Sequence, residues 1–193
     1  MTLILPLLSY FLGMLHAAIF VSYIINGKDP RTTGSRNPGS SNMLRLNGIL
    51  AGLLTCILDS SKPVAMYLIA AQLNYTHTQS IIIASISVLG HIFPVGRKGG
   101  RGVASGLGVC ILASPLLAFV SALFWGVLLR LYGSQWCGMY SVAASFCFMI
   151  TYYYLNGITT ISLTITVLTC LIVRQHIDHI IRFFQLPVGT TDL

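Results

Sequence analysis

Two polar loops, rich in glycine and flanked by basic residues, carry the side chains of this chain that could do chemistry. The first runs from Gly34 to Arg45 and the second from Gly96 to Gly102, and each lies between long apolar segments. Loops of this kind place many hydrogen-bond donors and positive charges next to an apolar phase. We therefore expect the two loops to form one site for an anionic ligand.

The first loop contains the turn signature Asn37-Pro38-Gly39. Proline fixes one backbone angle and glycine permits a positive φ, so successive N–H groups can point at one oxyanion. Neutral donors and guanidinium groups suited to phosphate add to these amides, namely Ser35, Ser40, Ser41, Asn42, Arg36 and Arg45. Taken alone, the stretch is equally compatible with an ordinary loop in which Ser41 or Asn42 caps the next helix.

The second loop, Lys98-Gly99-Gly100-Arg101-Gly102, lacks the spacing and the Lys-Ser/Thr of a nucleotide-binding P-loop. Its glycines would let the main chain approach a phosphate closely, and Arg101 supplies charge. A helix beginning near Val103 would direct its free N–H groups and positive dipole end at the same anion. Arg97 is explained by the positive-inside rule alone, and Lys98 is compatible with either interpretation.

Three further polar residues lie within apolar stretches. His91, just before Ile-Phe-Pro94, could accept a hydroxyl proton or hold a phosphate oxygen, although a lone histidine is more often structural. Asp59 and Lys62 are three residues apart and fit an intramembrane ion pair. Such a pair is either functional or a structural clamp, and the sequence favours neither.

The sequence gives little support for metal-dependent, covalent or paired-carboxylate catalysis. His176 and His179 lie three residues apart, but two ligands facing one way do not make a metal site, so we predict no metal and no cofactor. The four acidic residues are all aspartate, and no Ser/His/Asp motif is present. Covalent or paired-carboxylate catalysis is therefore not expected.

The composition places the chain among integral membrane proteins. Of its 193 residues, 55% are hydrophobic and 8% charged, and the mean hydropathy is +0.81. The net charge of +7 could suggest nucleic acid, but the Lys and Arg residues lie mainly at the ends of apolar segments. That distribution follows the positive-inside rule and predicts no nucleic-acid partner.

The apolar segments run over residues 3–25, 44–73, 79–95, 103–131, 140–155 and 158–174. Six spans would leave Arg174 and Arg182 on the side opposite the other basic residues. Pro115 disfavours a continuous helix and splits the fourth segment into a short pair. We predict an all-α membrane protein of about seven helices, some short, with the N-terminus outside, the C-terminus cytoplasmic and residues 1–193 in one domain. The 44–73 segment could itself break near Pro63.

The order of these motifs resembles the acyl-phosphate-dependent glycerol-3-phosphate acyltransferases of bacterial inner membranes, the PlsY family. The resemblance rests on Gly34-Ser-x-Asn-Pro-Gly-x-x-Asn-x-x-Arg45, then Asp59-x-x-Lys62, then Gly90-His-Ile-Phe-Pro94 with Lys98-Gly-Gly-Arg-Gly-Val-Ala-Ser105. It extends over nearly the whole chain.

The resemblance implies a seven-helix enzyme of the bacterial inner membrane whose site faces the cytoplasm. It would transfer an acyl group from acyl phosphate to the 1-hydroxyl of glycerol 3-phosphate, giving lysophosphatidic acid and phosphate. Its partners would be these substrates and membrane lipids. The implied catalytic residues are His91, Ser35 and Arg45. The implied substrate-binding residues are Asn37, Gly39, Asn42, Lys98, Gly99, Gly100, Arg101, Gly102, Ser141, His176 and His179, with Asp59 and Lys62 in support.

The chain departs from the family pattern at several positions. Arg36 stands for a glycine, Ser41 for a threonine, and Arg101 for a lysine, which keeps the charge and changes its geometry. His179 stands for an asparagine, a change compatible with an altered substrate preference or a weakened enzyme. The usual Gly-Ser-Ile-Pro of the first helix reads Gly13-Met-Leu-His16.

Two other functions fit parts of the sequence. A transporter or flippase of a small phosphorylated solute or lipid would also use helix ends and basic loops, but it would be favoured by inverted repeats, and none is evident. A membrane scaffold would leave the paired glycine loops unexplained.

Overall fold

The computed structural model describes residues 3–178 and 180–181, so the candidate residue His179 lies outside the described part. The described chain is built from helices and loops, which confirms the all-α prediction. The helices are α1 (Ile4–Gly13), α2 (Ala17–Asn26), α3 (Ser40–Gln72), α4 (His77–Ile92), α5 (Val103–Ala113), α6 (Pro115–Tyr132), the short 3-10 helix η1 (Ser134–Trp136), α7 (Cys137–Asn156) and α8 (Thr160–Gln175).

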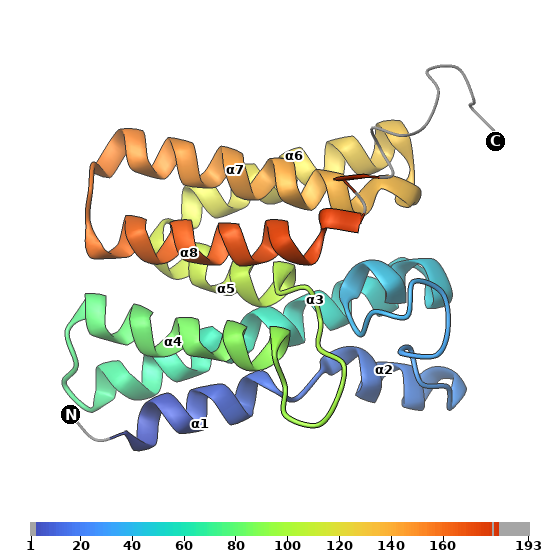
Figure 1. Cartoon of the computed structure of the whole chain (residues 1–193), viewed down its shortest axis with the longest axis horizontal. Helices are drawn as coiled ribbons and strands as arrows, with labels where there is room; N and C mark the ends of the chain where they lie inside the picture. The colour runs from blue at the N-terminus through green and yellow to red at the C-terminus, as the bar shows by residue number, and fades with distance from the viewer. Residues whose placement is uncertain (1–2, 179, 182–193) are drawn as a thin grey trace.

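With α1 and α2 taken as one broken segment, the described helices form seven segments that alternate in direction (Figure 1). The α2–α3 loop, the α6–α7 turn and the end of α8 lie toward the right-hand side of Figure 1, and the α3–α4 and α7–α8 turns lie at its left. The α4–α5 loop lies at the right-hand end of α4, near the middle of the picture. Loops that carry basic residues thus gather on one side of the bundle. The predicted count of about seven helices is confirmed.

Within the described residues, three helical stretches are long and apolar enough to cross a membrane: Ile4–Ile25, Ser40–Gln72 and Pro115–Tyr132. The helices Val103–Ala113 and Thr160–Gln175 are apolar but shorter. At 1.5 Å per residue, the 11 residues of α5 extend only about 17 Å, roughly half the hydrocarbon thickness. The break before Pro115 is confirmed, because Ser114 is extended with φ −161° and ψ 98° between α5 and α6.

Two breaks in the apolar segments lie where the sequence did not place them. The 3–25 segment breaks at His16, which is extended at φ −79° and ψ 112°. The 44–73 segment is interrupted at Gly48, with φ 84° and ψ 179°, while Pro63 stays inside α3. Glycine adopts a positive φ without steric cost, and a proline within a membrane helix is tolerated where neighbouring groups cover the freed backbone. Here α5 packs on Pro63, with Gly108 against its ring.

Small residues let α1 and α4 cross closely. A Cβ on Gly13 would overlap the backbone of Ser87, and one on Gly90 would overlap the backbone of Tyr10. Near this crossing the hydroxyl of Ser9 donates to the carbonyl of Ile83 at 2.6 Å. Close backbone approach of this kind holds helices together where no hydrophobic drive acts between them. It also fixes α4, and therefore His91 near its end, against the broken N-terminal segment.

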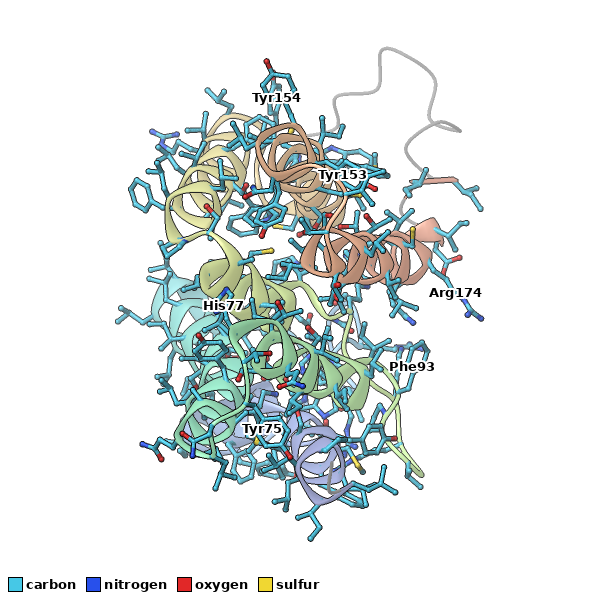
Figure 2. The ribbon with its side chains drawn as sticks, turned by 90° about the vertical axis from the view of Figure 1, so that its left-hand side faces the viewer. Tyr75, His77, Phe93, Tyr153, Tyr154 and Arg174 are labelled. Atoms are coloured by element: carbon cyan, nitrogen blue, oxygen red, sulfur yellow. The ribbon has the colours of Figure 1, made fainter. Side chains whose placement is uncertain are left out.

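Aromatic side chains mark the side of the bundle opposite the basic loops. Figure 2 looks at that side and shows Tyr75, His77, Tyr153 and Tyr154 there. Tyr154 points away from the bundle and is 88% exposed. Tyrosines with an apolar body and a polar tip are typical of the membrane–water interface.

Candidate active site

A buried ion pair holds the break between α1 and α2. Lys62 Nζ lies 2.7 Å from Asp59 Oδ1, and both side chains are almost completely buried. The ammonium also donates to the Leu15 carbonyl at 2.8 Å, while the Ala17 N–H donates to Asp59 Oδ1 at 3.3 Å. The cation therefore meets the carbonyl end of α1 and the carboxylate meets the N–H end of α2, as the helix dipoles favour.

His91 is packed against this pair. Its Nδ1 lies 3.3 Å from Lys62 Nζ and 3.7 Å from Asp59 Oδ1, and the residue is 2% exposed. Because the ammonium can only donate, Nδ1 acts as the acceptor and the remaining ring hydrogen lies on Nε2. Nε2 packs against Gly100, where an added Cβ would overlap it.

The second loop turns tightly over His91. The Gly100 N–H donates to the His91 carbonyl at 2.9 Å, and a Cβ on Gly99 would overlap the carbonyl of Ile92. Gly102 has φ +82° and is the N-cap of α5. The loop thus delivers Arg101 and the first N–H groups of α5 to one place, and only glycine fits at the points of closest approach.

Asn42 holds the first loop together from inside. Its amide nitrogen donates to the carbonyls of Pro30 at 3.0 Å and Thr33 at 3.2 Å. Its Oδ1 accepts from the Ser35 N–H at 2.9 Å, and the residue is fully buried. These hydrogen bonds use both ends of the amide, so the geometry makes Asn42 a shaping residue of the loop.

One backbone feature of this loop explains a departure from the family pattern. Arg36 has φ +54°, in the left-handed region that glycine adopts at least cost. This backbone conformation explains why the family pattern has glycine at position 36. A separate ion pair lies just before the loop, where Arg31 Nη2 is 2.6 Å from Asp29 Oδ2. This hydrogen-bonded partner lowers the pKa of the Asp29 carboxyl, and Asp29 raises the pKa of Arg31.

The two loops meet in one polar pocket, together with groups from α7 and the end of α8. It is lined by Asn37, Gly39, Ser40, Ser41, Arg45, Asp59, His91, Arg101, Gly102, Val103, Ala104, Gly138, Ser141 and His176. The N-termini of α3 and α5 both contribute, so two positive dipole ends and two guanidinium groups surround it. Most of the sequence-predicted residues are therefore brought together.

The remaining candidates lie elsewhere. Lys98 is exposed and is not part of the lining. Gly99 and Gly100 lie behind the pocket, shaping the turn, and Ser35 and Asn42 belong to the loop rather than the lining. The Ser35 Oγ atom is nevertheless buried with no hydrogen-bond partner within the described residues.

Hydrogen bonds orient the side chains around the pocket. Arg45 Nη1 donates to the Ser134 carbonyl at 2.8 Å, which ties the start of α3 to η1. Ser141 Oγ donates to the Cys137 carbonyl at 2.8 Å and accepts from Trp125 Nε1 at 3.1 Å. The His176 ring is buried at the end of α8, with Nδ1 2.7 Å from the Ile172 carbonyl.

An apolar cavity of about 760 Å³ adjoins the polar pocket. It lies among α3, α5, α6, α7 and α8, and its wall includes Leu53, Leu107, Trp125, Phe148 and Ile165. The pocket and the cavity share Ser40, Ser41, Val103, Ala104 and Ser141 as lining residues. A site with a cationic head and a long apolar extension suits an amphiphile with an anionic head group.

Comparison with known proteins agrees with this geometry. The family model described as glycerol-3-phosphate acyltransferase matches residues 3–186. The chain belongs to this family. The glycerol-3-phosphate acyltransferases of Coxiella burnetii (strain CbuG_Q212) and Ehrlichia ruminantium (strain Gardel) are 32% and 36% identical to it, covering 96% and 93% of this chain and 94% and 91% of the relatives.

Two crystal structures of PlsY, an integral membrane glycerol 3-phosphate acyltransferase, have the same fold. The lysophosphatidic acid form superposes with a TM-score of 0.81 at 29% identity, and the glycerol 3-phosphate form with 0.80 at 31%. Each match covers 94% of this chain and 91% of the other. The family resemblance read from the motifs is confirmed, and the acyltransferase interpretation is supported over the transporter.

Sequence reasoning missed Gly138, which lines the pocket, and the contact of His16 with His91. His16 was noted only as a departure from Gly-Ser-Ile-Pro, yet its ring packs against His91, with the centroids 4.7 Å apart. A histidine within an otherwise apolar segment was the available signal, because a buried polar ring requires a partner.

Proposed function

We propose that this protein transfers an acyl group from acyl phosphate to the 1-hydroxyl of glycerol 3-phosphate, giving lysophosphatidic acid and inorganic phosphate. The observation that carries the proposal is the cationic pocket that shares its wall with the 760 Å³ apolar cavity. The pocket matches the phosphates of both substrates and the cavity matches the acyl chain. Family membership supports the same reaction.

The phosphates bind between the two helix N-termini. Arg45 and Arg101 line the pocket from opposite loops and offer charge-assisted hydrogen bonds to phosphate oxygens. The first N–H groups of α3 and α5 lack partners within their helices and add neutral donors. Asn37, Gly39, Gly102, Ser141 and His176 complete the lining and orient the substrates. The Ser35 hydroxyl is buried outside the lining, so we assign Ser35 a supporting role in the first loop.

The reaction requires no protein nucleophile, because acyl phosphate carries its own leaving group. The 1-hydroxyl oxygen attacks the acyl carbonyl carbon, and the bond from that carbon to the phosphate oxygen breaks. Phosphate leaves with the electron pair, and the hydroxyl proton passes to a phosphate oxygen. The protein contributes the alignment of the two substrates and the stabilisation of the developing charge.

The geometry changes the role proposed for His91. As a general base it would need a lone pair facing the substrate, but Nδ1 faces the Lys62 ammonium at 3.3 Å. We assign His91 a supporting role: its ring and its carbonyl carry the glycine loop. Asp59 and Lys62 support His91 in turn. Lys98, exposed on the second loop, attracts anionic substrates by charge.

The same proposal includes the orientation of the protein in the membrane. The loops that carry basic residues lie on one side of the bundle (Figure 1), and the positive-inside rule places that side in the cytoplasm. The N-terminus is then outside, the site faces the cytoplasm of a bacterial inner membrane, and residues 1–193 act as one acyltransferase domain.

The test is phosphate release from palmitoyl phosphate by the purified protein in lipid cubic phase, with and without glycerol 3-phosphate. We expect release that depends on the acceptor and equals lysophosphatidic acid one for one. Arg101→Ala should raise the KM for glycerol 3-phosphate by at least about tenfold, the worth of one charge-assisted hydrogen bond. Arg97→Ala is the matched control, because Arg97 is exposed and outside the lining. Release independent of glycerol 3-phosphate, or an unchanged KM in Arg101→Ala, would contradict the proposal.

A further inference from the structure

His16 occupies the break between α1 and α2, where the family pattern given above has proline. The residue is extended, at φ −79° and ψ 112°, a conformation that proline would hold by its ring. In this chain the charges of Lys62 and Asp59 cover the backbone groups that the break exposes. The break is therefore kept without proline, and position 16 carries a side chain that can act elsewhere.

That side chain reaches the glycine loop. His16 is 2% exposed, and its Nε2 lies 3.0 Å from the His91 carbonyl and 3.1 Å from the Gly100 nitrogen. The Gly100 N–H also donates to the same His91 carbonyl at 2.9 Å. In one tautomer Nε2 accepts from Gly100, and in the other it donates to the His91 carbonyl. With either tautomer the ring makes a hydrogen bond at the junction, the point where the second loop folds back on the end of α4.

The junction controls the pocket through a short length of chain. Gly100 precedes Arg101, which lines the pocket, and lies two residues before Gly102, the N-cap of α5. Gly100 has no side chain of its own to fix it. Movement at Gly100 therefore displaces both the guanidinium and the N–H groups that the proposed function assigns to phosphate.

We propose that His16 is a positioning residue of the acyltransferase site, which holds Gly100 and thereby sets Arg101 and the N-terminus of α5 against the acceptor phosphate. This inference rests on the proposed function. It assigns to this chain a loop contact that a proline at position 16 cannot make, since proline has no ring nitrogen able to donate or accept here.

The test compares His16→Ala, His16→Pro and His16→Gln with Leu15→Ala as the control. Leu15 is in the same break, its side chain is 48% exposed, and its carbonyl bond to Lys62 is made by the backbone. We expect Ala and Pro at position 16 to raise the KM for glycerol 3-phosphate about tenfold, as one lost buried hydrogen bond implies, with kcat changed less than about threefold. Gln, whose amide both donates and accepts, should restore most of the affinity.

Amide hydrogen exchange over residues 96–102 supplies a readout independent of activity. Exchange should be faster in His16→Ala and His16→Pro, and unchanged in His16→Gln and Leu15→Ala. If His16→Pro keeps the wild-type KM and exchange, His16 only fills the break and the inference is overturned. If the wild-type protein lacks acyltransferase activity, the proposed function fails, while the exchange comparison still decides whether His16 holds Gly100.

Discussion

Asp59→Asn would leave the ammonium of Lys62 buried without its anion while preserving the shape of the side chain. Lys62 would still donate hydrogen bonds to the carbonyls of Leu15 at 2.8 Å and Gly13 at 3.4 Å. Removing one partner of a buried ion pair costs about 3–5 kcal/mol. Because the carbonyls still solvate the ammonium in part, we expect the lower end, about 3 kcal/mol, a factor of about 150 in the unfolding equilibrium.

Lys62→Met should cost more. Asp59 Oδ1 would still accept a hydrogen bond from the Ala17 N–H at 3.3 Å. Its Oδ2 has no hydrogen-bond partner within the described residues even in the intact pair. A buried carboxylate with one long hydrogen bond is poorly compensated, so we expect about 5 kcal/mol. The double variant carries neither charge. Its cost should fall short of the sum of the single variants by about 2–3 kcal/mol.

Equilibrium unfolding in mixed detergent micelles, followed by circular dichroism, measures these free energies. The matched control is the same cycle on Asp29 and Arg31, whose side chains are 19% and 30% exposed. A pair with that access to solvent should show a coupling below about 1 kcal/mol. Additive costs for Asp59 and Lys62, or a coupling no larger than that of the control pair, would refute the reasoning that this pair holds the break.

Three further predictions follow from the geometry. Gly100→Ala should lower kcat/KM about tenfold or more in the phosphate-release assay, because the added Cβ overlaps the His91 ring; wild-type rates would contradict the packing. Gly126→Leu should shift preference toward shorter acyl phosphates, since Gly126 lines the cavity with nothing within 4 Å of an added Cβ; equal chain-length profiles would count against the cavity as the acyl site. Asp29 has a lowered pKa in the folded state, so its contribution is present above its unfolded pKa, about 3.9, and is lost as the pH falls through the folded pKa. Protection factors of residues 27–39, corrected for the intrinsic pH dependence of amide exchange, should fall across that window in the wild type and stay flat in Asp29→Asn.

Local signals in the sequence were sufficient to predict the class of protein and much of its helical architecture. Long apolar segments require helices in a membrane, because every backbone polar group there must be satisfied internally. Pro115 marked the break between α5 and α6 correctly, since its steric effect is confined to its neighbours. The two glycine loops and their basic residues were recognisable as groups suited to an anion for the same reason: turn geometry and charge are encoded within a few residues.

The breaks at His16 and Gly48 were not predictable, and Pro63 was misleading, because whether a helix bends depends on what covers its freed backbone groups. For the first break that cover comes from Asp59 and Lys62, on a different helix. The sequence alone determined which groups could bind phosphate. Only the tertiary structure decided that the lone pair of His91 is occupied by Lys62 and that His16 meets Gly100, 84 residues away. Such contacts depend on how α1, α3 and α4 pack, and packing is set by the whole bundle rather than by any local stretch of residues.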